Sequence, residues 1–306
     1  MRLAAALIVT GCALALAGCG SSGDASEKGS IEATAAPPGS LEALWRGPGP
    51  DVAIVPGTSD FGPGENRISF LIVDKQSRLV ERPTARIWIA RGLRQKPFGQ
   101  TVARLERIGI PGGVQADAQN IFVARVRTPT PGKYWILAEP VGGRRIQALG
   151  NVVVKREPEA PRVGDRAIPS RNPTVRGGTD PRRITTARPP DTELLQVSVA
   201  QALAAQSPFV VTFSTPLYCQ TRTCGPVVQV VQSVAARWQA RGVEFIHVEV
   251  YEDNDPAKGT NRWVDEWQLP TEPFTFVVDR RGVIRAKLEG AFSAGELDAA
   301  VGRVAP

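Results

Sequence analysis

Two cysteines in the last third of the chain have the clearest potential for chemistry. The run FSTPLYCQTRTCGPVV, residues 213–228, places Cys219 and Cys224 just before a helix whose first turn Pro226 suits. Unpaired N–H groups at a helix N-terminus favour an anion, so this placement predicts Cys224 as the reactive thiolate. Cys219 is close enough in sequence to resolve a mixed disulfide, or to form a disulfide with Cys224 if the Cα atoms come within about 7 Å. The alternative to redox exchange is a permanent structural disulfide that closes the loop between the two cysteines.

The elements expected to position this pair alternate between helix and strand from residue 192 onward. The predicted order is helix, strand, helix, strand, helix, strand, strand, helix. Ser198 is expected to cap the first helix, Gly242 to end the second, and apolar residues of the second to share one face. The corresponding ranges are 198–206, 209–213, 226–242, 243–251, a short helix around 263–267, 274–279, 283–288 and 294–304.

This order and the run Cys224-Gly225-Pro226 resemble the thioredoxin fold, where Cys-Gly-Pro-Cys stands between the same strand and helix. The resemblance spans residues 192–304 and is closest to membrane-tethered thioredoxin-like proteins of the cell envelope. It implies an α/β domain over 192–306 that exchanges thiols and disulfides without an organic cofactor. The chain departs from the family at Val227, Thr212 and Thr223, where the second cysteine, a buried acid and a tryptophan would stand.

The same resemblance implies a cis-proline opposite the cysteines. The run EPFTFVVD, residues 272–279, is similar to the start of a strand in these domains and makes Pro273 the cis candidate, with Pro270 second. A cis bond there would present the Glu272 backbone to a substrate strand, so Pro273 counts as a site residue. A plain proline at the start of a strand is the alternative, since cis X–Pro bonds are uncommon.

His247, the one histidine of the chain, lies in the middle of a predicted strand. Together with Cys219 and Cys224 it resembles the ligand set of the Sco copper chaperones, which share this fold, and thiolates and imidazole suit copper. That family spaces its cysteines Cys-x-x-x-Cys and carries its histidine in a later loop, whereas a mid-strand histidine is more often a packed residue. Copper delivery is therefore an alternative function, and no other metal site is expected.

The N-terminus has the features of an exported lipoprotein. Arg2 precedes an apolar run, Leu3 to Gly18, that is shorter than a membrane span of about 20 residues and typical of a secretory signal. The sequence Leu16-Ala17-Gly18-Cys19 resembles the bacterial lipobox, which implies cleavage after residue 18 and acylation of Cys19, for instance with palmitate. We expect a signal peptide over 1–18 and a tether over 19–40. The protein would then be lipid-anchored to the bacterial membrane on its extracytoplasmic side, where disulfides persist.

Residues 41–155 alternate apolar and polar positions in short runs between Gly and Pro turns. About seven strands in this length suggest an immunoglobulin-like β-sandwich. Trp88 and Trp135 lie on predicted strands and are expected in the core. The predicted strands are 52–55, 67–73, 84–90, 102–108, 120–127, 133–138 and 145–154.

Residues 156–191 are rich in Pro, Arg and Gly and predict a linker or an arm over the next domain. The net charge of +7 is spread along the chain, so it does not predict a nucleic-acid partner. The sequence as a whole predicts thiol–disulfide exchange with proteins of the cell envelope. A binding or assembly lipoprotein with a structural disulfide is the main alternative, and the oligomeric state is left open.

Overall fold

The computed structural model describes residues 35–305, apart from residues 51, 177, 220 and 221. Residues Ala36–Pro306 form one compact unit. The predicted signal peptide 1–18, the lipid-bearing Cys19 and most of the tether 19–40 lie outside the described residues. In the part of the chain that is described, every helix is too short or too polar to cross a membrane.

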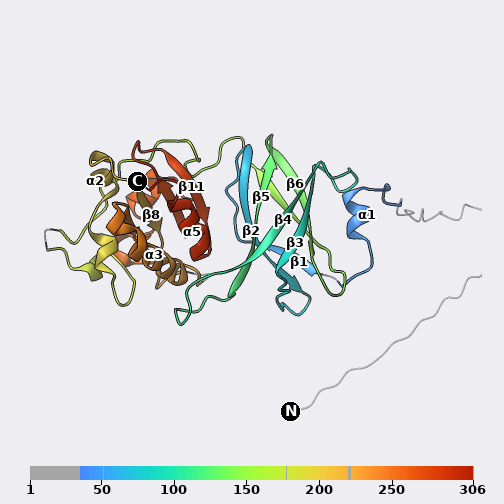
Figure 1. Ribbon diagram of the computed structural model, residues 1–306, viewed down its shortest axis with the longest axis horizontal. Coiled ribbons are helices and arrows are strands. Elements are labelled where there is room, and N and C mark those ends of the chain that lie inside the picture. Colours follow the sequence, from blue (N-terminus) through green and yellow to red (C-terminus); the bar gives the residue numbers. More distant parts are fainter. Residues whose placement is uncertain (1–34, 51, 177, 220–221, 306) are drawn as a thin grey trace, which may run out of the picture. The chain divides into compact units, whose positions relative to one another are not determined.

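The N-terminal half is a closed barrel of seven strands, coloured blue to green in Figure 1. The hydrogen-bonded order is β1-β2-β5-β4-β3-β6-β7, and a parallel bridge between β1 and β7 closes it. A short helix, α1 (Leu41–Trp45), precedes the barrel. The strands are β1 (Val52–Pro56), β2 (Gly64–Asp74), β3 (Thr84–Ala90), β4 (Gly99–Arg107), β5 (Asn120–Thr128), β6 (Gly132–Pro140) and β7 (Ala148–Val154).

The expected seven strands are present, but the expected sandwich of two separate sheets is not what they form. β3 and β4 pair over six residues, from Thr84 opposite Arg104 to Ile89 opposite Gly99. In a sandwich these two strands would be unpaired edges of different sheets, whereas here their pairing joins all seven strands into one sheet. Every second residue of a strand points inward and fills the barrel. Phe70 of β2 stacks on Phe122 of β5 with ring centroids 5.5 Å apart.

Trp88 and Trp135 lie outside this interior. Both are half-buried and pack beside α1 in a smaller cluster with Leu41 and Leu137. Cations cover their rings, Arg86 over Trp88 and Lys133 over Trp135. The prediction that they are core residues is therefore only partly confirmed, because they support the outer wall of the barrel.

The C-terminal half is a four-stranded sheet in the order β11-β10-β8-β9. β8 and β9 are parallel, and β10 is antiparallel to both β8 and β11. The predicted order of helices and strands is confirmed: α2 (Val199–Ala204), β8 (Phe209–Phe213), α3 (Cys224–Trp238), β9 (Glu244–Val248), α4 (Arg262–Glu266), β10 (Phe274–Val278), β11 (Ile284–Glu289) and α5 (Ala294–Val301). Short 3-10 turns lie at Pro181–Arg183, Thr192–Leu195, Gln239–Arg241, Glu252–Asn254 and Pro256–Lys258.

Helices cover both faces of this sheet, which is why every residue of its central strands β8 and β10 is buried. Val210 of β8 packs in one core cluster with residues of α3 and α5. Its neighbours Phe209 and Val211 point the other way, into a cluster that holds Trp267 and residues of α2 and α4. This order of elements agrees in part with the thioredoxin-like arrangement expected from the sequence, and Cys224 is the first residue of α3.

The arm, residues 156–191, lies on the C-terminal domain instead of hanging free. The Ile284 N–H donates to Asp165 O, and the Ala167 N–H donates to Gly282 O, so the arm forms one antiparallel bridge at the start of β11. Further along, the Trp267 indole N–H donates to Ser170 Oγ over 3.0 Å. Of the two alternatives for this segment, the structure therefore favours an arm; the domain boundaries themselves stay predictions.

Candidate thiol site

A tight turn after β8 brings the two cysteines together. The Cys219 N–H donates to Thr215 O, and the Arg222 N–H donates back to Cys219 O, which folds the segment towards the start of α3. The Cys224 N–H then donates to Cys219 Sγ over 3.3 Å. The structure holds both cysteines as thiols, so the disulfide between them stays a prediction.

The two thiols differ in exposure. Cys219 is 9% exposed, whereas Cys224 has no exposed surface. Cys224 does begin the helix, as the sequence predicts, but its N–H points at the sulfur of Cys219. A helix N-terminus favours the anion that its N–H groups face. The thiolate favoured by this geometry is therefore that of Cys219.

The expected low pKa of Cys224 is not found. Burial raises the pKa of the Cys224 thiol far above its ordinary value, and the hydrogen bond and charge of Cys219 act in the same direction. A hydrogen bond from the Thr215 backbone opposes the shift without cancelling it. Cys224 is thus a protonated, inaccessible thiol next to the more accessible Cys219.

The Glu272–Pro273 bond is cis, as predicted; among the described residues the other cis bond precedes Pro189 and not Pro270. Pro273 is buried, and its carbonyl accepts the Gly290 N–H over 2.8 Å. Burial, followed by the charge of Cys219, raises the pKa of the half-buried Glu272 carboxyl. The charge of Glu272 in turn raises the pKa of Cys224, so the carboxyl before the cis-proline and the thiol pair act on one another electrostatically.

Tyr251 is a neighbour of the site that the sequence did not reveal. Burial and the charges of Glu272, Cys224 and Cys219 raise the pKa of its phenol. Its ring meets that of Tyr218 edge to face, with centroids 6.3 Å apart. No local pattern marks Tyr251, because it reaches the site only through the pairing of β9 with β8.

His247 is buried and fully engaged in hydrogen bonding. Its Nδ1 lies 3.2 Å from Thr185 Oγ1, and its Nε2 lies 3.1 Å from both Ser214 Oγ and Ser214 O. Burial lowers the pKa of the imidazole, against the opposing charge of Glu249. Within the described ranges no three His, Cys, Asp or Glu side chains are placed to hold a metal, so the structure does not assemble Cys219, Cys224 and His247 as a copper site.

The arm also supports the thiol turn, which the sequence did not predict. The Leu217 N–H, two residues before Cys219, donates to Thr186 Oγ1 over 3.2 Å. The Thr186 N–H in turn donates to Glu249 Oε2 over 2.6 Å. Thr186 therefore links Glu249, the residue directly after β9, to the turn that carries Cys219. No signal in the proline-rich arm sequence points to this contact.

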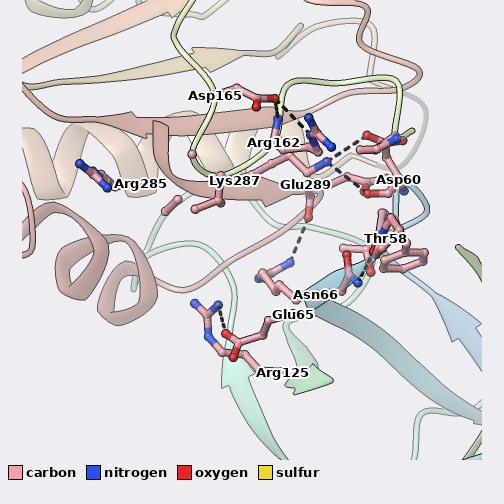
Figure 2. Close-up of a pocket in the computed structure, with 18 of the residues that line it drawn as sticks. Thr58, Asp60, Glu65, Asn66, Arg125, Arg162, Asp165, Arg285, Lys287 and Glu289 are labelled. Atoms are coloured by element: carbon pink, nitrogen blue, oxygen red, sulfur yellow. Dashed lines mark hydrogen bonds and ion pairs between the residues drawn. The ribbon is translucent and has the colours of Figure 1, made fainter. Parts of the chain in front are cut away.

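A pocket of about 820 Å³ lies elsewhere, where residues of β2 and the arm meet β11 (Figure 2). Its charged side chains are largely paired with one another. Lys287 Nζ lies 2.9 Å from Asp60 Oδ2. Burial opposes ionisation of Asp60, but Lys287 and the Glu159 and Ala160 N–H groups outweigh it and lower the pKa of that carboxyl. These pairings favour a structural junction over a ligand site.

No protein-family model matches the chain, and no curated protein sequence matches it. Several solved structures resemble part of it. One is a thiol:disulfide interchange protein of the thioredoxin family from Chlorobium tepidum TLS, 19% identical, covering 35% of this chain and 85% of that one, with a TM-score of 0.29. Another is a candidate thiol:disulfide interchange protein DsbE from Chlorobium tepidum, 17% identical, covering 33% and 84%, with a TM-score of 0.26. Likeness this slight does not bear on function.

Proposed function

We propose that this protein exchanges thiols and disulfides with other proteins of the cell envelope through Cys219 and Cys224. The observation that carries the proposal is the hydrogen bond from the Cys224 N–H to Cys219 Sγ at the start of α3. This hydrogen bond places the Cys219 sulfur next to Cys224 at the N-terminus of α3, where an anion is favoured. The cis Pro273 is the third residue of the proposed site. The roles expected from the sequence are exchanged: Cys219 attacks and Cys224 resolves.

The proposed exchange takes place in two steps. The Cys219 thiolate attacks one sulfur of a partner disulfide, forms a mixed disulfide and releases the partner's other sulfur as a thiolate. Cys224 then attacks the Cys219 sulfur, forms the Cys219–Cys224 disulfide and releases the second partner sulfur, while its proton passes to a partner thiolate. Two electrons thereby move from the cysteine pair to the partner, and the reverse steps oxidise a partner dithiol.

Trapping tests this assignment in the full-length protein. Cys224→Ser is expected to accumulate mixed disulfides on Cys219, because the resolving thiol is lost, whereas Cys219→Ser should accumulate few. Adducts are separated on non-reducing gels and mapped by mass spectrometry, with the double variant as control. Adducts on Cys219→Ser alone would restore Cys224 as the attacking thiol.

A structural disulfide is the second candidate, and the burial of both cysteines favours it. If neither single variant forms adducts and the wild type stays oxidised in cells, thiol–disulfide exchange is refuted and a structural disulfide between Cys219 and Cys224 is supported. A redox titration separates the two as well. A structural disulfide should have a reduction potential below about −300 mV, whereas an exchanging cysteine pair should equilibrate with glutathione.

We further propose that acylated Cys19 anchors the protein to the bacterial membrane on the extracytoplasmic side. The Leu-Ala-Gly-Cys sequence after the apolar run supports this. Metabolic labelling with a palmitate analogue should mark the wild type and Cys12→Ala, the matched control, but not Cys19→Ala. Label that persists in Cys19→Ala would refute the anchor.

We also propose that the barrel is an immunoglobulin-like module whose two sheets have joined at their edges. Its strand order places β1-β2-β5-β4 beside β3-β6-β7, as strands A-B-E-D and C-F-G in that fold. The Tyr134 hydroxyl donates to Thr130 O over 2.7 Å at the start of β6, as a tyrosine corner does. A crystal structure with two faces packed about 10 Å apart would support this, and an evenly round barrel would refute it.

A further inference from the structure

A loop of the barrel lies against the first turn of α3. The loop, residues 108–119, connects β4 to β5. The Val114 N–H donates to Gln229 Oε1 on α3 over 2.7 Å. A Cβ added to Gly225 would stand 3.3 Å from Val114 Cγ1, so the Val114 side chain touches the backbone next to Cys224. The barrel therefore borders the turn that carries the thiols.

Apolar contacts on both sides of Gly109 hold this loop in place. Ile110 packs against the core cluster of α3 and α5. Ile108 packs with Ala291, which follows β11. Gly109 has a φ of 78°, a conformation that suits glycine, and a Cβ there would lie 3.5 Å from Pro226 Cβ. The loop is thus fixed on the C-terminal domain and is more than a chance surface contact.

Apolar side chains remain exposed at both ends of the cysteine pair. Val114, at the Cys224 end, is 54% exposed. Leu217 and Tyr218, directly before Cys219, are 58% and 39% exposed. Apolar groups left in water around a buried reactive group are typical of a surface that contacts a partner. Exposed apolar side chains therefore border the turn that carries the thiols, one from the barrel loop and two from the residues directly before Cys219.

We propose that loop 108–119 is a specificity-determining wall of the thiol site, with Val114 as its contact point. The inference rests on the proposed exchange function and gives the barrel a role in it. The favoured partner carries its disulfide or thiol on an exposed, extended protein segment. Such a segment, like a small disulfide, can reach Cys219, whereas a bulky group next to the reacting sulfur meets Val114.

Two maleimides of different size test whether loop 108–119 restricts access to Cys219, and this test does not depend on thiol–disulfide exchange. The native, reduced protein is treated with N-ethylmaleimide and with a polyethylene glycol maleimide, and the modified cysteine is located by peptide mass mapping. Val114→Trp is expected to lower the rate of the bulky reagent at Cys219, relative to the small one, by about tenfold, equivalent to about 1.4 kcal/mol in the barrier. Val114→Ala should raise the same ratio.

Val102→Trp is the matched control, because Val102 is 55% exposed on β4, opposite Arg86. It should change the ratio by less than about twofold, as surface substitutions usually do. An unchanged ratio in both Val114 variants, with unaltered thermal unfolding, refutes the wall.

The same proteins are then assayed for exchange with oxidised glutathione and with insulin. If the Val114 variants change the ratio of the two maleimide rates but the wild type reduces neither disulfide, the role of loop 108–119 is supported and the exchange function is refuted. If the wild type reduces both disulfides and the Val114 variants leave the ratio unchanged, only the role of the loop is refuted.

Discussion

Arg67 of β2 joins the barrel to the C-terminal domain through a buried cluster of hydrogen bonds. Its Nε and Nη2 donate to the Glu296 carboxylate over 2.6 and 2.9 Å. Its Nη1 donates to Glu289 O over 3.1 Å, and Nη2 donates to Ala291 O over 2.8 Å. The Arg67 side chain is 4% exposed and that of Glu296 is 12% exposed. We therefore expect Arg67→Ala to be strongly destabilising.

The size of the effect follows from what the substitution leaves behind. Glu296 would keep its charge with little access to water, and two backbone carbonyls would lose their donors. Removing one partner of a buried ion pair costs about 3–5 kcal/mol. Because Glu296 is not completely buried, water can replace part of the lost interaction. We expect the free energy of unfolding to fall by about 4 kcal/mol, within that range.

Urea denaturation measures this loss, and the same pocket supplies a control. Arg125 is 55% exposed and lies 3.3 Å from Glu65, which is 66% exposed. An exposed pair contributes about 0–1 kcal/mol, so Arg125→Ala should have little effect. Replacing Arg67 and Glu296 together by methionine should recover most of the loss, because no unpaired charge remains. An Arg67→Ala variant no less stable than Arg125→Ala would refute the reasoning.

Three further predictions concern single groups. Burial and then the charge of Cys219 raise the pKa of Glu272 in the folded protein. At pH values above the ordinary pKa of a carboxyl group, keeping Glu272 ionised therefore lowers the stability of the folded protein. Glu272→Gln should therefore raise the melting temperature at about pH 7.5 and leave it unchanged at about pH 4; an equal gain at both would contradict this. Burial lowers the pKa of His247, so stability should fall as the pH drops below about 6.5, and its C2 proton in NMR spectra should titrate at a lower pH than that of an exposed imidazole. Ser198 forms a capping box with Gln201, so Ser198→Ala should cost about 1 kcal/mol in urea denaturation, and no loss would mean that the cap is dispensable.

The C-terminal fold was predictable because its signals are local. The capping residue Ser198, the left-handed Gly242 and the buried run 209–213 each mark the start, end or burial of one element. Each depends on backbone chemistry or periodicity within a few residues. The cis bond at Pro273 was predicted from a resemblance and is also present in the structure.

The rest depends on contacts between distant residues, which local patterns do not specify. Alternation predicts strands but not which edges pair, so the β3–β4 pairing that closes the barrel was missed. Cys224 begins α3 as the sequence predicts, but the fold of the turn places the Cys219 sulfur in front of the Cys224 N–H, and no local pattern shows that contact. Thr186 had no signal, since its partners Leu217 and Glu249 are far away in sequence.

The burial of Cys224 bears on the order of events in the proposed exchange. With no exposed surface and a raised pKa, its thiol is a poor nucleophile towards any disulfide in solution. A mixed disulfide on Cys219 changes this, because it places an electrophilic sulfur next to Cys224 and removes the negative charge that opposed its ionisation. Cys224 should therefore become reactive only after Cys219 has engaged a partner. This order would favour resolution over side reactions, whichever way the electrons flow.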